Sequence, residues 1–141
     1  MATFNKFNVF VENLAEKVHD LGADTLKVAL SNTGPSASNT VFANITEISA
    51  GNGYTAGGTA AAQSSSAQTS GTYKLVLNDV VFTATGGTIG PFRYVVLYND
   101  TPTSPADPLI GWYDYGSSIT LNSGETFTVD FDGTNGVLTL A

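Results

Sequence analysis

The segment FRYVVLY, residues 92–98, decides the fold class. In an extended chain its side chains would alternate between two faces, and both faces are apolar or aromatic except at Arg93. A strand that faces water on one side alternates apolar and polar residues, whereas a strand covered on both sides is apolar throughout. We therefore expect residues 92–99 to form a central strand, or a strand covered by another surface.

The sequence around this segment is typical of an antiparallel β protein. In residues 126–131, Phe127, Val129 and Phe131 alternate with polar residues, which predicts one buried and one solvated face. Other β-branched or aromatic runs are short and are separated by turns rich in Gly, Pro and Asn. The predicted strands are residues 25–31, 73–77, 80–85, 92–99, 109–115, 118–121, 126–131 and 137–140. About eight short strands predict a mainly all-β fold, an antiparallel β-sandwich of jelly-roll type with two four-stranded sheets.

One amphipathic helix is predicted near the N-terminus. Over residues 9–21, Val11, Leu14, Val18 and Leu21 recur at helical spacing, and a glycine follows where a left-handed C-cap would lie. The opposite face carries the charged residues and His19, the single histidine, so we expect a solvated face. The chain of 141 residues is long enough for one core, and we expect residues 1–141 to form a single domain.

The middle of the chain contains few large side chains. Apolar residues at 42, 45 and 48 predict one or two helical turns, with Thr40 as a possible N-cap. The segment TAAAQSSSAQTSGT, residues 59–72, is a flexible linker by composition, but we prefer an ordered edge strand or a long surface loop. Small side chains would let another chain approach closely, so Ala61 and Ser65 are candidate interface residues. On this interpretation, Ala61→Arg weakens assembly and leaves the monomer folded.

Composition and charge limit the possible partners. The chain has 12 acidic and 5 basic residues and no cysteine, which excludes disulfides and thiolate sites. After Lys74 the only cation is Arg93, against seven carboxylates, so this half would repel a phosphate backbone. No apolar stretch is long enough to cross a bilayer, and the N-terminus lacks the features of a signal peptide. We expect neither nucleic acid nor a membrane as a partner.

The sequence contains no motif that predicts catalysis or a cofactor. Asp130 and Asp132 in DFDGTNG begin like a calcium loop, but Asn135 and Ala141 occupy the positions that need Gly and Glu, so we interpret the segment as a turn. GNGYTA, residues 51–56, satisfies a relaxed dinucleotide fingerprint without its strand and helix. We therefore expect no enzyme activity, no metal and no cofactor.

Aromatic residues supply the other candidate interface positions. Alternation along a strand sends some rings of a cluster outward, and an outward Tyr or Trp favours a protein interface or a sugar platform. The candidates are Tyr94, Tyr98, Trp112 and Tyr113.

Several segments together resemble small virion proteins of tailed bacteriophages. These are FRYVVLYND (92–100), LIGWYDYG (109–116), LNSGETFTVDFDGTNGVLTL (121–140), FNVFVENLAEKVHDLGADTLKVALSN (7–32) and GNGYTAGG (51–58). The resemblance is to jelly-roll cement or decoration proteins, and it implies binding to the outside of the phage capsid, where such a protein stabilises contacts between major capsid subunits. It also implies that the protein is made in the host cytoplasm and located on the virion, and it implies no catalytic residues.

Two further expectations concern assembly and an alternative role. We expect a homodimer ahead of a trimer, because two-fold dimers are the commonest closed assemblies. The alternative function is a phage fibre or tail-associated module that recognises a host surface glycan through outward aromatic residues such as Trp112.

Overall fold

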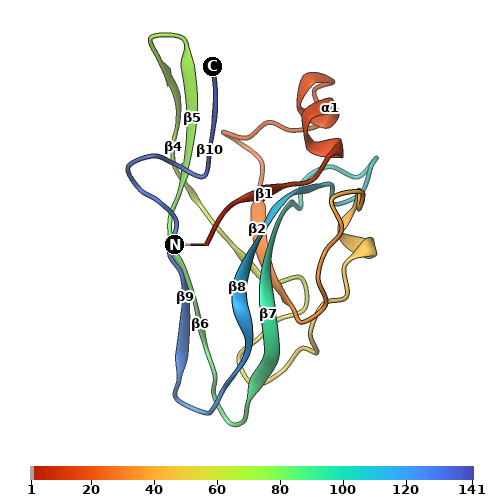
Figure 1. Ribbon diagram of the computed structural model, residues 1–141, viewed down its shortest axis with the longest axis vertical. Coiled ribbons are helices and arrows are strands. Elements are labelled where there is room, and N and C mark those ends of the chain that lie inside the picture. Colours follow the sequence, from red (N-terminus) through yellow and green to blue (C-terminus); the bar gives the residue numbers. More distant parts are fainter. Residues whose placement is uncertain (1) are drawn as a thin grey trace.

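The computed structural model describes residues 2–141, and the chain is mainly β with antiparallel sheets. Figure 1 shows the arrangement of the elements. In chain order they are β1 (Asn5–Lys6), α1 (Val9–Ala15), β2 (Leu26–Ser31), a 3₁₀ helix (Phe42–Asn44), β3 (Thr59–Ala60), β4 (Gln63–Thr69), β5 (Thr72–Leu77), β6 (Val80–Thr83), β7 (Ile89–Asn99), β8 (Leu109–Leu121), β9 (Thr126–Val129) and β10 (Leu138–Leu140).

The strands form three sheets. The five-stranded sheet has the order β1-β8-β7-β2-β3, a three-stranded sheet has the order β10-β5-β4, and β6 pairs with β9. Two predicted strands, 109–115 and 118–121, are the single strand β8, which passes through Gly116 at a φ of 101°. Only glycine adopts this backbone conformation without strain, so Gly116 accommodates an irregularity within one strand.

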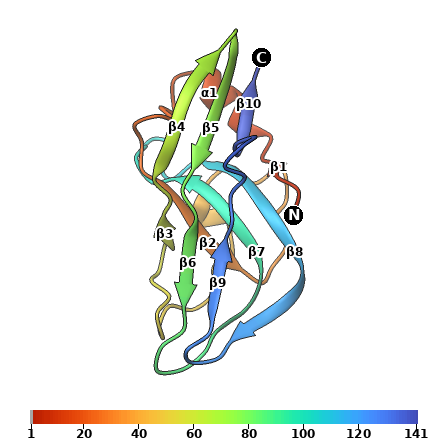
Figure 2. The same ribbon diagram turned by 90° about the vertical axis from the view of Figure 1, so that its left-hand side faces the viewer.

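The predicted central strand is confirmed. β7 lies between β8 and β2, and its side chains contribute to two separate apolar clusters. The larger cluster joins side chains from all three sheets, including Leu75 of β5, Phe82 of β6 and Phe92 of β7. The smaller cluster lies on the opposite face of the five-stranded sheet and contains Val96 and Tyr98. Figures 1 and 2 show β6 and β9 running alongside β7 and β8, and the larger cluster lies between them.

The predicted helix over residues 9–21 is too long. α1 ends at Ala15, and Lys17 takes a left-handed conformation with φ of 68°. The amide of Val18 then donates to the Asn13 carbonyl at 2.8 Å, which closes a Schellman-type end. The chain therefore leaves the helix before His19, whose side chain is buried rather than solvated. Gly22 is not the helix cap.

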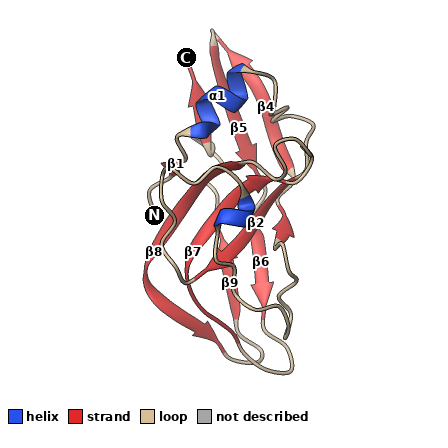
Figure 3. Ribbon diagram, turned by 90° about the vertical axis from the view of Figure 1, so that its right-hand side faces the viewer, coloured by secondary structure: helices blue, strands red, loops and turns tan. Residues whose placement is uncertain are grey.

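The middle of the chain covers the outer face of the five-stranded sheet. The predicted turns at residues 42–48 are a single 3₁₀ turn, whose N-cap is Val41 and not Thr40. Figure 3 shows this turn against the sheet, where Phe42 packs on the smaller cluster. Gly58 has a φ of 81°, and a Cβ there would overlap the Val28 carbonyl, so only glycine allows this loop to lie so close to β2.

The segment of small residues is an ordered edge strand, one of the two structures preferred from the sequence. β4 pairs with β5 and forms one edge of the three-stranded sheet, with six of its seven residues exposed. Ala61 precedes this strand and is buried, so an arginine there would disrupt the core and unfold the monomer. The prediction of Ala61 as an interface residue is therefore wrong. None of the helices described for residues 2–141 is long and apolar enough to span a membrane.

Candidate interaction groove between two sheet edges

The six predicted interface residues do not gather on one surface. Ser65 is exposed on β4, and Ala61 is buried beside the start of that strand. Tyr94 is partly buried under the guanidinium of Arg93, which lies 5.4 Å from the ring centroid. Trp112 and Tyr113 are neighbours in β8, so their side chains point to opposite faces of the sheet.

Tyr98 is a core residue rather than an interface residue. Its ring stacks on Phe42 with centroids 4.1 Å apart, and its hydroxyl donates to the Gly57 carbonyl at 2.5 Å. Burial raises the pKa of this hydroxyl, which stays a neutral donor. The hydrogen bond attaches the glycine-rich loop to the central strand, so the prediction of Tyr98 as an interface residue is wrong.

Trp112 also packs within the molecule. Its ring contacts Phe7 with a centroid distance of 4.6 Å and belongs to the smaller cluster. The side chain is partly buried, so it does not form a free aromatic platform. Tyr113, on the other face of β8, is the predicted residue that lies in a groove.

The groove arises because the hairpin of β8 and β9 is splayed. These strands are consecutive and joined by a tight turn, in which the Glu125 amide donates to the Asn122 carbonyl at 2.9 Å and the Asn122 amide donates to Glu125 Oε1 at 2.7 Å. Nevertheless β8 pairs with β7 and β9 pairs with β6. Figure 1 shows the two strands diverging above the turn. Their facing edges form no ladder within the described residues.

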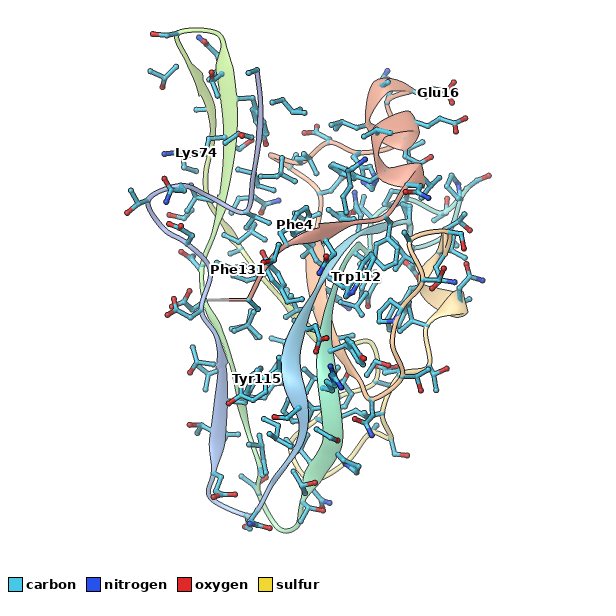
Figure 4. All side chains as sticks on the ribbon, in the orientation of Figure 1. Phe4, Glu16, Lys74, Trp112, Tyr115 and Phe131 are labelled. Carbon is cyan, nitrogen blue, oxygen red and sulfur yellow. The ribbon has the colours of Figure 1, made fainter. Side chains whose placement is uncertain are left out.

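Aromatic rings line the space between these two edges. Phe4 contacts Tyr113 at a centroid distance of 5.7 Å, Tyr113 contacts Phe131 at 6.2 Å, and Tyr115 contacts Phe127 at 5.6 Å. The groove has a volume of about 490 Å³. In Figure 4 Phe4 and Phe131 lie close together, and Tyr115 extends from β8 toward β9. With 53% of its surface exposed, Tyr115 is the most accessible ring of the groove.

Carboxylates form the polar rim of the groove. Asp130 is exposed on the β9 side, and Asp132 follows two residues later. Asp132 Oδ1 accepts hydrogen bonds from the amides of Thr134 and Asn135 at 2.9 and 2.8 Å, and these bonds lower the pKa of Asp132. The DFDGTNG segment is thus a turn organised by Asp132, as the sequence indicated.

The chemistry of the groove is suited to binding. Burial raises the pKa of Tyr113 to about 12, so its hydroxyl is neutral at physiological pH. Aromatic floors with a charged rim contribute buried area and orientation, as in small-molecule and peptide sites. Within residues 2–141, no three His, Cys, Asp or Glu side chains are grouped so as to hold a metal.

Most of the groove could not be predicted from the sequence. Alternation placed Phe127 and Phe131 correctly on a buried face, but local pattern does not reveal that β9 pairs with β6 instead of its neighbour β8. No sequence pattern indicated that Phe4 belongs to the groove, because the neighbouring strand β1 is only two residues long and was not predicted.

Comparison with known proteins finds no matching family model, no matching curated protein and no matching solved structure. The groove and the motifs of the sequence are therefore the grounds for a functional proposal.

Proposed function

We propose that this chain is a structural virion protein of a tailed phage, a jelly-roll-type β-sandwich that binds the outer surface of the capsid and stabilises contacts between major capsid subunits. The observation that carries the proposal is the aromatic groove between the unpaired edge of β9 and the part of β8 beyond its pairing with β1. An accessible apolar groove beside free backbone edges favours a binding role over a catalytic one. The capsid as the partner comes from the resemblance of the sequence motifs.

The charge of the chain supports a protein partner. The net charge is −7, and two of the five cations are occupied in ion pairs, Lys27 with Asp100 and Arg93 with Asp114. Such a surface repels the DNA inside a capsid and favours a partner with exposed cations. This supports a location on the outer face of the shell.

A homodimer is part of the proposal. β4 is an exposed edge strand without charged residues, so two copies can approach there with little repulsion. Ser65 lies in this strand, and its small side chain permits close contact. A two-fold pairing of β4 edges is the arrangement that we propose ahead of a trimer.

The experiment uses expanded heads assembled without this chain, from the phage that encodes it. The purified protein is mixed with these heads, sedimented, and the heads are then heated and inspected for rupture. We expect co-sedimentation and a higher rupture temperature. A folded protein that neither sediments with the heads nor protects them contradicts the proposal. Sedimentation velocity of the free protein tests the dimer.

The alternative is a glycan-binding module of a fibre or tail. Tyr115 favours it, because an exposed ring beside a carboxylate rim is a suitable sugar platform. Trp112, the ring first expected in this role, is packed on Phe7. The alternative would be supported if the protein binds a glycan on an array, loses this binding in Tyr115→Ala and has no affinity for heads.

A further inference from the structure

We propose that the groove binds an extended, cationic segment of a partner protein, which pairs along the free edge of β9 and inserts alternate apolar side chains between β8 and β9. This inference rests on the proposed function for the identity of the partner, a capsid protein. The chemistry of the partner segment follows from β9 and from the residues that line the groove.

β9 has one free backbone edge. One edge of β9 pairs with β6, from Val80↔Val129 to Thr83↔Thr126. Its other edge faces the groove, and no strand within residues 2–141 pairs with it. An unpaired edge binds an extended peptide through main-chain hydrogen bonds, while pockets for alternate side chains give specificity.

Apolar and exposed side chains alternate along this segment. Phe127 and Val129 of β9, and Phe131 just after it, point into the core, and the residues between them are exposed. A strand added beside β9 continues this pattern, so every second side chain points toward Tyr113 and Tyr115. A groove of about 490 Å³ holds several aliphatic side chains.

The rim of the groove is acidic and favours a cationic partner. Asp130 directly follows the last residue of β9, is exposed, and belongs to neither ion pair of the described residues. A Lys or Arg beside Asp130, in an added strand that continues one residue past Val129, would gain an ion pair of opposite charge across the groove edge. The exposed β4 edge of a second copy offers neither a cation for Asp130 nor large apolar side chains for the groove. The occupant is therefore a different, cationic protein.

The experiment measures fluorescence anisotropy of labelled eight-residue peptides with the full chain. One peptide alternates Val with Lys, a second alternates Val with Glu, and a third alternates Ser with Lys. We expect only the Val/Lys peptide to bind. Asp130→Lys should weaken that binding about tenfold and strengthen binding of the Val/Glu peptide.

Glu16→Lys is the matched control. It makes the same change in net charge at the exposed C-cap of α1, which lies far from Tyr115 and the groove in Figure 4. We expect it to leave Val/Lys binding within about twofold of the original. Circular dichroism verifies that both variants are folded, and Asp130→Asn, which keeps the shape of the side chain, should give an intermediate loss.

Hydrogen exchange shows where the peptide binds. Bound Val/Lys peptide should slow exchange of the amides in residues 126–131 and leave those of β4 unchanged. Four results would each overturn the inference. The Val/Lys peptide does not bind, or the Ser/Lys peptide binds equally well. Alternatively, the peptide protects β4 instead of β9, or Glu16→Lys weakens peptide binding as much as Asp130→Lys does. If the protein self-associates and Asp130→Lys abolishes this self-association, the groove binds a second copy and the inference is also overturned.

The two proposals fail separately. If the protein binds the peptide in the groove but does not bind phage heads, the groove is still a peptide-binding site and the capsid is not its partner. If the protein binds phage heads and Asp130→Lys does not change this binding, the decoration function is supported and the groove is not the docking site.

Discussion

At the scale of single residues, His19 shows how burial changes chemistry. The side chain is 6% exposed, and its Nδ1 lies 3.0 Å from the Asn99 side-chain nitrogen. The same nitrogen donates to Asp24 Oδ2 at 2.7 Å, which orients the amide as a donor toward His19. Nδ1 therefore accepts, and the ring is neutral with its proton on Nε2. Burial lowers the pKa of His19 to about 4, although the nearby Asp24 carboxylate partly offsets this effect.

We predict that this histidine makes the protein sensitive to mild acid. The unfolded chain binds a proton below about pH 6.5, whereas the folded chain resists protonation until about pH 4. Stability is therefore complete above pH 6.5 and falls as the pH decreases toward 4. Urea unfolding should show a loss of about 2 kcal/mol between pH 7.5 and 4.5.

The variant His19→Asn provides the comparison for this prediction. Its amide oxygen replaces the acceptor at Nδ1 and has no pKa in this range, so its stability should change less between pH 7.5 and 4.5. Equal slopes in the two proteins would assign the acid sensitivity to other groups.

At the scale of elements, the end of α1 is strained at one residue. Lys17 occupies the position after the helix where glycine is usual, with φ of 68°. A non-glycine residue in this conformation costs about 1 kcal/mol or more. We predict that Lys17→Gly stabilises the protein by about 1 kcal/mol in urea unfolding.

Ala15→Gly is the control for the helix end. Ala15 is the last residue of α1, where glycine removes no strain and only loosens the helix. This variant should lose up to about 1 kcal/mol. A loss of stability in Lys17→Gly would show that the lysine side chain contributes more than its backbone strain costs.

The same elements show what the sequence can predict. Alternation and turn residues identified the longer strands and the central position of β7, because these depend on local side-chain patterns. The helix was predicted too long because Leu14, Val18 and Leu21 keep helical spacing after the backbone has left the helix. A lysine in a left-handed conformation gives no signal in the sequence.

The groove could not be predicted because it depends on contacts between residues that are distant in the chain. Whether Tyr98 and Trp112 are exposed is decided by segments that cover the sheet, the 3₁₀ turn with Phe42 and the N-terminal Phe7. The pairing of β9 with β6, which opens the groove, joins residues 43 to 49 positions apart. Local patterns give the face of a strand but not its partner.

At the scale of the whole molecule, the chain passes repeatedly between sheets. β5 leads from the three-stranded sheet into β6 of the two-stranded sheet, and β9 leads back to β10. Side chains of all three sheets share the larger apolar cluster. Such a shared core makes separate unfolding of one sheet unfavourable, so we expect residues 1–141 to behave as one cooperative domain.

This cooperativity is testable with the single tryptophan. Leu75 is fully buried in β5 of the three-stranded sheet, and Leu75→Ala should cost about 2–5 kcal/mol. Trp112 lies in the five-stranded sheet, so its fluorescence reports on a sheet that does not contain the mutation. We predict that Leu75→Ala lowers the urea midpoint equally by Trp112 fluorescence and by far-ultraviolet circular dichroism. Val81→Ala, at an exposed position of β6, should shift both midpoints only slightly. A fluorescence midpoint that stays unchanged in Leu75→Ala would divide the chain into two folding units, because the loss in one sheet would then not reach the other.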